Sequence, residues 1–265
     1  MQIISSKDNN IIKHIKKLKE KKYRDEYDEF IIEGIKMLKE AIAEKAKIKK
    51  VIFSESFIKN NNIDELLRTY IVQDNIIYVS DSIFKIITEL GTPQGVLAII
   101  EKNEPNDINS LNNEIIIALD NLQDPGNFGT ILRTADSANI KNIIVSKGTV
   151  DCYSSKVVRS TMGAIFRCKV IECENLKKSL EILKNKGYNI IVTALDAKKN
   201  IYETDYSKSI IVIGNEANGV SQEVQELATN KVIIPMLGKT ESLNASIAAG
   251  IIIYEYVRKK INTEK

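Results

Sequence analysis

The second half of this sequence alternates short, continuous apolar runs with segments of helical length. The apolar runs lie at 115–119, 143–145, 190–194, 210–213 and 232–234, and helices are expected at 128–139, 154–164, 176–186, 222–229 and 243–259. Runs that are apolar at every position are typical of strands buried on both faces, and intervening helices are typical of parallel strands. The pattern predicts an α/β fold with a parallel sheet covered on both faces.

A polar stretch at 103–113 interrupts the pattern. It contains Pro105 and has no apolar period, which is typical of a linker. We therefore predict a domain at 1–102 and a second one at 114–265. The first is a smaller α/β domain, with helices expected at 9–23 and 34–46 and strands at 30–32, 51–53, 76–79 and 96–100.

Composition restricts the class of protein. The 265 residues are 43% hydrophobic and 28% charged, as in an ordinary globular chain. The net charge of +3 is too small to indicate nucleic-acid binding by itself, so local clusters would have to carry that function. The N-terminus lacks a signal peptide and no run is long enough to span a bilayer, so we expect a cytoplasmic protein without membrane contact.

Cysteine and histidine are scarce. Cys152, Cys168 and Cys173 form no C-x-x-C pair, which favours reduced thiols. His14 is the single histidine and sits in a lysine-rich stretch. We expect it to be solvated surface. A zinc site and a Ser-His-Asp mechanism are both disfavoured, and we expect no metal.

Polar clusters follow three of the expected strands, where parallel sheets bind ligands. The first runs over 120–129 into a helix that carries Arg133. It is either an anion-binding loop at a helix N-terminus or a plain turn. In the plain turn, Asn127 would be the N-cap and Arg133 would pair with Asp136.

The second cluster is the glycine-rich stretch 214–221. Its spacing superficially matches a phosphate-binding loop, but Val220 stands where that motif needs lysine. It is not a G-x-G-x-x-G fingerprint either. A structural turn would explain the glycines but not Glu216 between them.

The third cluster runs over 235–246 into the last helix. Ser242 or Asn244 could cap that helix. The helix begins with a small-residue surface, which would suit close approach of a ligand or tight packing in a core: Ala245, Ala248, Ala249 and Gly250.

Together the clusters resemble the three signature motifs of the SpoU (TrmH-like) branch of the SPOUT methyltransferases, over roughly 115–260. The matching residues are Asn127-x-Gly129 with Arg133, Gly214-Asn215-Glu216-x-x-Gly219, and Ile234-Pro235-Met236 with Ser242-Leu243-Asn244-x-Ser246. One small departure is Ala245, where many relatives carry valine. The order of the motifs and their positions at strand ends make the combination specific.

The resemblance implies an S-adenosylmethionine-dependent RNA methyltransferase that modifies a ribose 2′-hydroxyl. It also implies a C-terminal trefoil knot and a homodimer. The catalytic candidates are Arg133, Asn127, Glu216, Ser242 and Asn244, and the cofactor-binding candidates are Gly214, Ile234, Leu243, Ala194, Met236 and Ser246. We expect Arg133 to clamp a phosphate and stabilise alkoxide charge rather than act as a base, because a guanidinium hardly deprotonates. Glu216 would position Arg133 or Asn244.

The first domain resembles the L30e/L7Ae-like RNA-binding modules attached to this branch, which favours ribosomal RNA over tRNA. The matching stretches are 30–34 with Glu40-Ala41, and 92–98. A run of basic residues near the N-terminus could hold RNA phosphates or be a solvated helix face. Arg159 and Arg167 are weaker candidates for RNA binding. The run contains Lys13, Lys16, Lys17, Lys19, Lys21, Lys22 and Arg24.

Three alternatives remain open. A tRNA ribose methyltransferase would carry the same motifs. A non-catalytic RNA-binding protein could keep the fold, although it should have lost Arg133, Glu216 or Asn244. A nucleotide-dependent oxidoreductase or hydrolase would lack its expected glycine fingerprint here.

Overall fold

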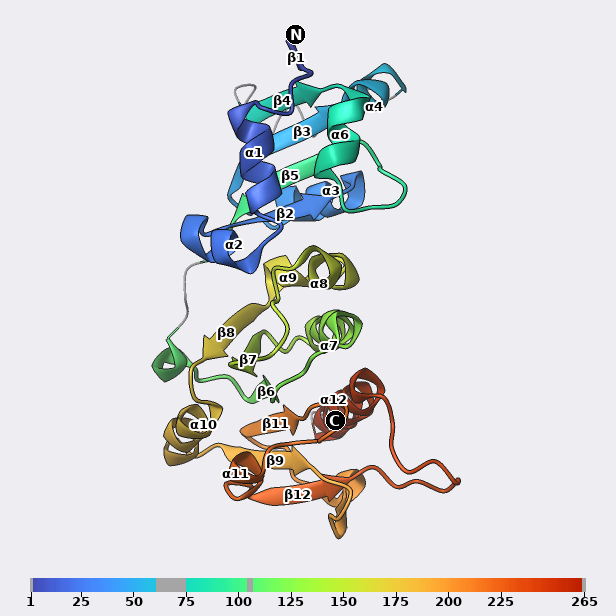
Figure 1. Ribbon diagram of the computed structural model, residues 1–265. Helices are drawn as coiled ribbons and strands as arrows, with labels where there is room; N and C mark the ends of the chain where they lie inside the picture. The colour runs from blue at the N-terminus through green and yellow to red at the C-terminus, as the bar shows by residue number, and fades with distance from the viewer. Residues whose placement is uncertain (1, 61–74, 104–106, 264–265) are drawn as a thin grey trace. The chain divides into compact units, whose positions relative to one another are not determined.

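The computed structural model describes residues 2–60, 75–103 and 107–263 and forms two compact units (Figure 1). The first unit comprises Met1–Asn103 and Tyr153–Phe166, and the second comprises Glu104–Cys152 and Arg167–Lys265. Part of the expected linker, 104–106, lies outside the described residues. The segment 153–166 falls in the stretch that we assigned to the second domain, yet it packs with the first unit.

The second unit contains a seven-stranded sheet in which every pair of neighbours is parallel, in the order β10-β12-β9-β11-β6-β7-β8. The predicted parallel sheet is confirmed. Its strands are β6 (Ile115–Leu119), β7 (Asn142–Ser146), β8 (Lys169–Cys173), β9 (Asn189–Thr193), β10 (Lys199–Asn200), β11 (Ser209–Ile213) and β12 (Asn230–Ile233).

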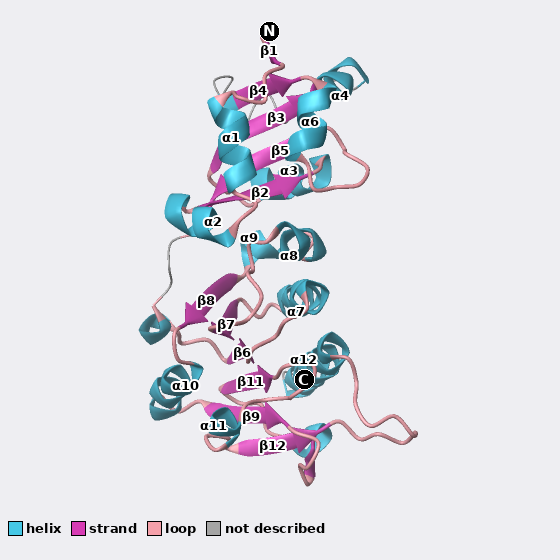
Figure 2. Cartoon of the chain, in the orientation of Figure 1, coloured by secondary structure: helices cyan, strands magenta, loops and turns pink. Residues whose placement is uncertain are grey.

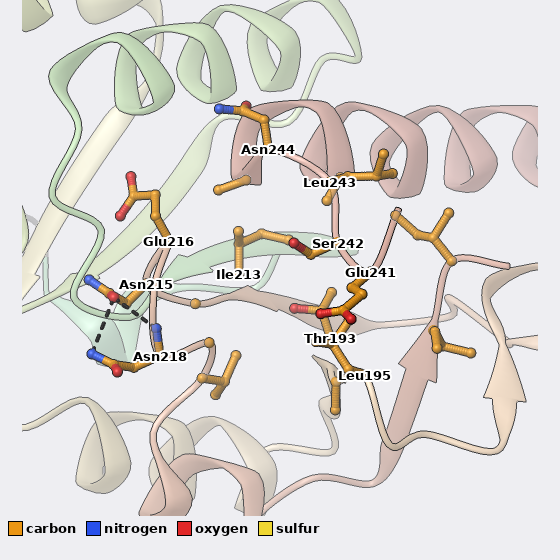
Figure 3. A pocket seen from close by; sticks show the side chains of 18 of the residues that line it. Thr193, Leu195, Ile213, Asn215, Glu216, Asn218, Glu241, Ser242, Leu243 and Asn244 are labelled. Carbon is orange, nitrogen blue, oxygen red and sulfur yellow. Dashed lines mark hydrogen bonds between the residues drawn. The ribbon is translucent and has the colours of Figure 1, made fainter. Parts of the chain in front are cut away.

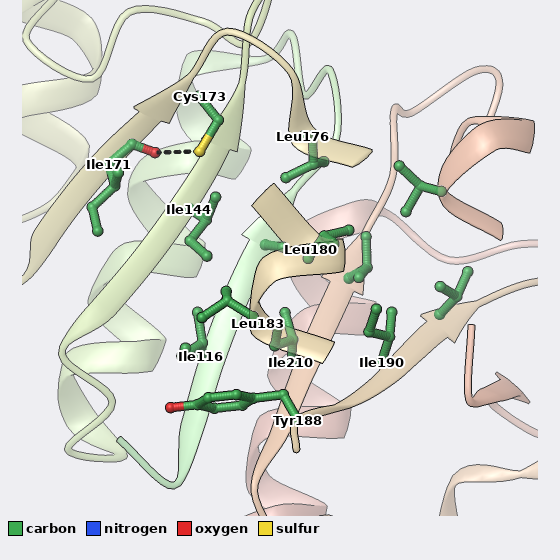
Figure 4. Packing of buried hydrophobic residues seen from close by; sticks show 14 of the residues in the cluster. Ile116, Ile144, Ile171, Cys173, Leu176, Leu180, Leu183, Tyr188, Ile190 and Ile210 are labelled. Carbon is green, nitrogen blue, oxygen red and sulfur yellow. Dashed lines mark hydrogen bonds between the residues drawn. The ribbon is translucent and has the colours of Figure 1, made fainter. Parts of the chain in front are cut away.

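Helices flank this sheet on both sides (Figure 1). On one side are α10 (Leu176–Asn185) and the short α11 (Gln222–Gln225), and on the other α7 (Pro125–Ser137) packs against α12 (Ala245–Thr263). Two 3₁₀ turns, Ile108–Ser110 and Ile201–Glu203, complete the unit. Alternate residues of β6 and β11, such as Ile116 and Ile210, pack with Leu180 and Leu183 of α10 in one buried cluster (Figure 4). Truncating a buried leucine of this kind typically costs about 2–5 kcal/mol.

Several details of the second half differ from the sequence prediction. The short strand β10 was not predicted, and the helix expected at 222–229 ends at Gln225. We did not predict β8, because this edge strand alternates exposed and buried residues instead of forming a continuous apolar run. The helix expected at 154–164 is two short helices, α8 (Ser155–Ser160) and α9 (Ala164–Arg167). The chain breaks between them because Met162 and Gly163 have positive φ angles of 50° and 93°.

The first unit contains a five-stranded mixed sheet in the order β1-β4-β3-β5-β2. Strand β5 runs antiparallel to β2 and β3, whereas β4 runs parallel to β3 and β1. The strands are β1 (Ile3–Ile4), β2 (Glu29–Glu33), β3 (Ile48–Ser54), β4 (Ile76–Val79) and β5 (Val96–Glu101). Among the described residues, the helices of this unit besides α8 and most of α9 are α1 (Asn10–Lys17), α2 (Lys21–Tyr27), α3 (Ile35–Ala43), α4 (Glu55–Asn60) and α6 (Asp81–Ile87).

The single helix expected at 9–23 is two helices, because the chain is extended at Glu20 (φ −98°, ψ 135°). Arg24 stabilises this break. Its side chain is buried, and Nη1 donates to the carbonyls of Leu18 and Lys19, at 2.7 Å each. These carbonyls would otherwise lack partners at the end of α1.

His14 is not the solvated residue that we expected. Its Nε2 lies 2.6 Å from the carboxylate of Glu29, and its ring packs on Tyr27 at 4.9 Å between centroids. The three cysteines are free thiols. Burial raises the pKa of Cys168 to about 12 and also raises the pKa of Cys173. Among the described residues, no helix is long and apolar enough to cross a bilayer.

Candidate active site

A cavity of about 540 Å³ lies in the second unit beyond the carboxyl ends of β9, β11 and β12 (Figure 3). It is bounded by the segments that follow these strands, beginning at Ala194, Gly214 and Ile234. Five of the six residues predicted to bind the cofactor line it: Gly214, Ile234, Leu243, Ala194 and Met236. The sixth, Ser246, lies buried in the first turn of α12 and does not line the cavity.

The loop after β11 folds tightly on itself. Asn215 and Gly219 exchange backbone hydrogen bonds of 2.9 Å in both directions. A Cβ on Gly214 would lie 2.1 Å from the carbonyl carbon of Gly219, so only glycine fits there. The Asn215 amide also donates to the carbonyl of Asn121, at 2.8 Å. The glycines therefore give the loop its shape, as a structural turn requires.

Glu216 has a separate role from the glycines. Its carboxylate accepts from the backbone N–H groups of Gln123 and Asp124, at 3.2 and 3.1 Å, and from the Asn127 amide at 2.9 Å. Burial pushes the pKa of this carboxyl upward, but the hydrogen bonds outweigh burial and hold the pKa below its usual range. Glu216 is therefore a carboxylate that joins the loop after β11 to the loop after β6.

Asn127 extends this connection to the third cluster. Its amide nitrogen donates to Glu216, while its Oδ1 accepts from the Asn244 amide at 2.9 Å. The Oδ1 of Asn244 in turn accepts from the backbone N–H and hydroxyl of Ser246, at 2.9 and 2.6 Å. One chain of hydrogen bonds thus links all three motifs. We call Glu216, Asn127 and Asn244 the amide chain.

Helices α7 and α12 both begin at the site, and each has a side chain that caps its N-terminus. Asp124, rather than Asn127, caps α7, since its carboxylate accepts from the backbone N–H of Asn127 at 2.8 Å. Our interpretation of Asn127 as the N-cap was wrong, because Asn127 lies inside the helix. Asn244 caps α12 through the N–H groups of Ser246 and Ile247. Ser242 instead lines the cavity.

Arg133 stands apart from the amide chain. It lies six residues beyond Asn127 on α7, about 9 Å along the axis. Its side chain is exposed and makes no hydrogen bond or ion pair with the described residues. The pairing with Asp136 that a plain surface helix would show is absent here, because Asp136 binds Lys141 and Arg167 at 2.9 and 2.7 Å.

One structural residue of the site was not singled out from the sequence. Asp120 is buried directly after β6, and its carboxylate accepts from the backbone N–H of Ser221 at 2.8 Å. It fixes the far end of the loop that begins at Gly214. Its position immediately after an apolar strand was the available signal. Two further carboxylates, Asp196 and Glu241, line the cavity.

The basic run of the first unit is only partly exposed. Lys13 and Lys17 are exposed, Lys16 is half-buried, and Lys21 lies 3.0 Å from Asp25. Arg24 does not belong to this exposed set, because it is buried against α1 and holds backbone carbonyls. Of the weaker candidates, Arg167 is paired with Asp136 and Arg159 lies on α8.

Metal ligands do not gather in the part of the chain that the structure describes: no group of three or more His, Cys, Asp or Glu side chains could hold an ion. What the site offers is a cavity lined mainly by apolar surface, with loop backbone and the carboxylates of Asp196 and Glu241 in its wall and the amide chain at its border. Such a cavity suits a small organic molecule with a few polar groups.

Comparison with known proteins agrees with this geometry. Residues 114–254 match the SpoU rRNA Methylase family, and residues 9–98 match the MRM3-like substrate binding domain. The chain is 30% identical to a 23S rRNA (guanosine(2553)-2′-O)-methyltransferase of Bacillus subtilis, covering 96% of this chain and 98% of that protein. It is 34% identical to a putative TrmH family tRNA/rRNA methyltransferase of Staphylococcus saprophyticus, covering 88% and 97%.

A similar solved structure is the S-adenosylmethionine-bound rRNA methyltransferase of Sinorhizobium meliloti. The two chains align with a TM-score of 0.85 at 30% identity, over 97% of this chain and 98% of the other. Both units are included in that match.

Proposed function

This chain belongs to the SpoU rRNA methylase family and is an S-adenosylmethionine-dependent RNA ribose 2′-O-methyltransferase, and from that premise we propose that its substrate is 23S ribosomal RNA. The observation that carries this choice is the end-to-end match, since one relative that acts on 23S rRNA aligns over both units. The substrate-binding domain matched at 9–98 supports the same choice.

The cavity beside the amide chain fits the cofactor. Its volume of about 540 Å³ lies within the roughly 300–1,000 Å³ that small-molecule sites occupy. Apolar side chains such as Ile213, Ile234 and Leu243 would contact the adenine, and the loop backbone at Gly214 would supply hydrogen bonds. The carboxylates of Asp196 and Glu241 could pair with the methionine ammonium. When bound, S-adenosylmethionine supplies an electrophilic methyl group on its sulfonium.

The protein's part of the reaction is to orient a ribose hydroxyl and stabilise the charge that it develops. We assign Arg133 to this task. A guanidinium can hold the neighbouring phosphate through two parallel hydrogen bonds and also face the developing alkoxide. Because the guanidinium does not give up its proton, the phosphate would accept the hydroxyl proton.

The amide chain then acts as a positioning device. Glu216 and Asn127 use their side-chain hydrogen bonds on each other and on Asn244. They hold the loop after β11 against the start of α12, where Ser242 and Leu243 line the cavity. Ser242 lies on this wall, where its hydroxyl could hold the ribose or its phosphate.

We further propose a cytoplasmic homodimer built through α12, with the trefoil knot that the family resemblance implies. Ile247, Tyr254 and Ile261 are large apolar or aromatic side chains, each about half exposed, at every seventh position of this helix. Residues at this spacing share one helix face. Covering that face with a second copy would remove it from water, and it would bring the exposed Arg133 of the adjacent α7 toward the partner's cavity.

An assay in which all cellular RNAs compete for the enzyme tests the proposed choice of substrate. Total RNA and labelled S-adenosylmethionine are incubated with the enzyme, and the RNA is separated by size. We expect label in 23S rRNA, and we expect the Arg133→Ala variant to transfer none. Label confined to tRNA would contradict the substrate while leaving the chemistry intact.

A further inference from the structure

Two tyrosine rings of the first unit lie nearly parallel to each other and are partly exposed; we call them the tyrosine surface. Tyr23 and Tyr27 are one turn apart on α2, with ring centroids 6.2 Å apart and planes only 13° from parallel. Tyr27 also packs against the core of this unit and against His14. Its ring is therefore held in place, and that of Tyr23 lies nearly parallel to it. Helices α1 and α2, which carry this surface, are labelled in Figure 2.

Lysine side chains lie over the same rings. The Nζ of Lys17 is 5.2 Å from the centroid of Tyr23 and 5.9 Å from that of Tyr27, and the Nζ of Lys22 is 5.5 Å from Tyr23. The hydrogen bond to the Tyr27 hydroxyl raises the pKa of Lys17, which keeps this ammonium charged. Both lysines have flexible stems and can turn from a ring toward a phosphate.

Two acidic side chains around the rings have partners other than Lys17 and Lys22. Asp25 binds Lys21 and Lys102, at 3.0 and 2.6 Å, and Glu29 binds His14. Glu20 and Glu26 are also exposed nearby. Neither Lys17 nor Lys22 has a carboxylate partner among the described residues. Two ammonium groups therefore lie over the rings without a carboxylate partner in the part of the chain that the structure describes, and that of Lys17 is also 3.4 Å from the Tyr27 hydroxyl.

We propose that Tyr23 and Tyr27 form a stacking platform for an unpaired base of the RNA substrate, while Lys17 and Lys22 hold the adjoining phosphates. The inference rests on the proposed function and assigns a specific contact to the substrate-binding domain matched at 9–98. An aromatic face accepts any base that is free of its duplex, and cations beside it select a nucleic acid. An acidic peptide would use the lysines but leave the ring faces unused.

Fluorescence anisotropy and 2-aminopurine quenching can test the platform together. The probe is a single-stranded RNA of about 12 nucleotides that carries one 2-aminopurine, and the comparison is the same strand in a perfect duplex. Tyr23→Ala should weaken single-strand binding about 5- to 150-fold and abolish the quenching. Tyr23→Phe should retain both. Tyr202→Ala, which removes an exposed tyrosine of the second unit, is the matched control and should change neither.

Salt dependence separates the rings from the lysines. Tyr23→Ala should lower affinity without changing the slope of log K against log salt, whereas Lys17→Ala should reduce that slope by about 0.7 for a single-stranded probe. Unchanged affinity and quenching in Tyr23→Ala, or equal effects on the single strand and the duplex, would overturn the platform. Binding that responds to Lys17→Ala but not to Tyr23→Ala would also overturn it, since a purely electrostatic face would then remain.

Failure of this inference is distinguishable from failure of the proposed function. If the enzyme methylates 23S rRNA and Tyr23→Ala leaves KM for RNA unchanged, only the platform is wrong. If no methyl transfer to any RNA occurs with the wild-type protein, the proposed function is wrong, whatever the oligonucleotide measurements give.

Discussion

The loops around the cavity and the basic run of the first unit use their polar side chains in opposite ways. In the loops, Glu216, Asn127 and Asn244 are bonded to one another and to backbone groups. In the basic run, Lys17 and Lys22 project beside tyrosine rings and have no carboxylate partner among the described residues. The bonded side chains of the loops hold the loop conformation. The lysines of the basic run keep their charge available for binding RNA. Arg133 sits in the catalytic unit but resembles the second group.

This difference predicts two classes of variant. Substituting a residue that holds the loop conformation should lower both protein stability and activity. Substituting a residue whose charge is free to contact the substrate should lower only RNA binding or turnover.

Arg133→Ala should give the largest effect on turnover with almost none on folding. Losing a group that stabilises developing charge typically costs about 100- to 1,000-fold in kcat. The exposed Arg133 side chain has no hydrogen bond or ion pair with the described residues to lose. Turnover, thermal unfolding and binding of S-adenosylmethionine are measured together. Arg167→Ala is the matched control, because Arg167 is bonded to Asp136. That control should lose stability and retain turnover, and a stable, active Arg133→Ala would contradict our account of the centre.

Gly214→Ala should impair cofactor binding and stability together. Its Cβ would lie 2.1 Å from backbone of the same loop, so the loop must move, at a cost of about 1–3 kcal/mol. The control is Gly238→Ala, where an added Cβ meets nothing within 4 Å. Calorimetric titration with S-adenosylmethionine should show weakened binding for Gly214→Ala alone. Equal affinities in the two variants would place the cofactor elsewhere.

Glu216→Gln should lower the free energy of unfolding by about 0.5–1 kcal/mol at neutral pH, because a charged acceptor of three hydrogen bonds is lost while solvent screens the exposed carboxylate. The folded-state pKa of this carboxyl is lowered. Its stabilisation is therefore complete above the unfolded-state pKa of about 4.3 and is lost as pH falls through the folded-state pKa.

Denaturant unfolding across pH 3–8 should accordingly show the wild-type advantage over Glu216→Gln shrinking only at acid pH. Glu223→Gln, at an exposed position of α11, should resemble the wild type throughout. A difference between wild type and Glu216→Gln that did not depend on pH would contradict the account of this carboxylate.

Single substitutions in the basic run should have the smallest effects of these variants. Alanine at Lys13, Lys16, Lys17 or Lys21 should reduce the salt slope of binding to a single-stranded RNA by about 0.7 where that lysine contacts a phosphate. Arg24→Ala should leave the slope unchanged and lower stability, since Arg24 holds two backbone carbonyls. A flat response to all four lysine variants would assign them to plain solvated surface.

Sequence patterns predicted five of the seven strands of the second sheet and the loops that bound its cavity. This was possible because buried parallel strands are apolar at every position and because ligand loops follow their carboxyl ends. Strand β8 was missed because an edge strand exposes one face. The break between α8 and α9 was missed because Met162 adopts a positive φ angle, which a methionine in the sequence does not predict.

Individual side-chain roles were harder to predict than the site as a whole. The spacing of Glu216, Asn127 and Asn244 along the chain could not show that they bond to one another, because their contacts span 89 and 117 residues. Likewise, nothing in the run of basic residues distinguishes the buried Arg24 from the exposed Lys17. That distinction depends on where α1 ends.

The nucleoside that receives the methyl group tests the central claim most directly. After transfer from labelled S-adenosylmethionine, 23S rRNA is digested to nucleosides and the labelled product is identified. We predict a single 2′-O-methylated nucleoside, and none with Arg133→Ala. Label on a base instead of a ribose would contradict the assignment of Arg133 to a ribose hydroxyl and its neighbouring phosphate.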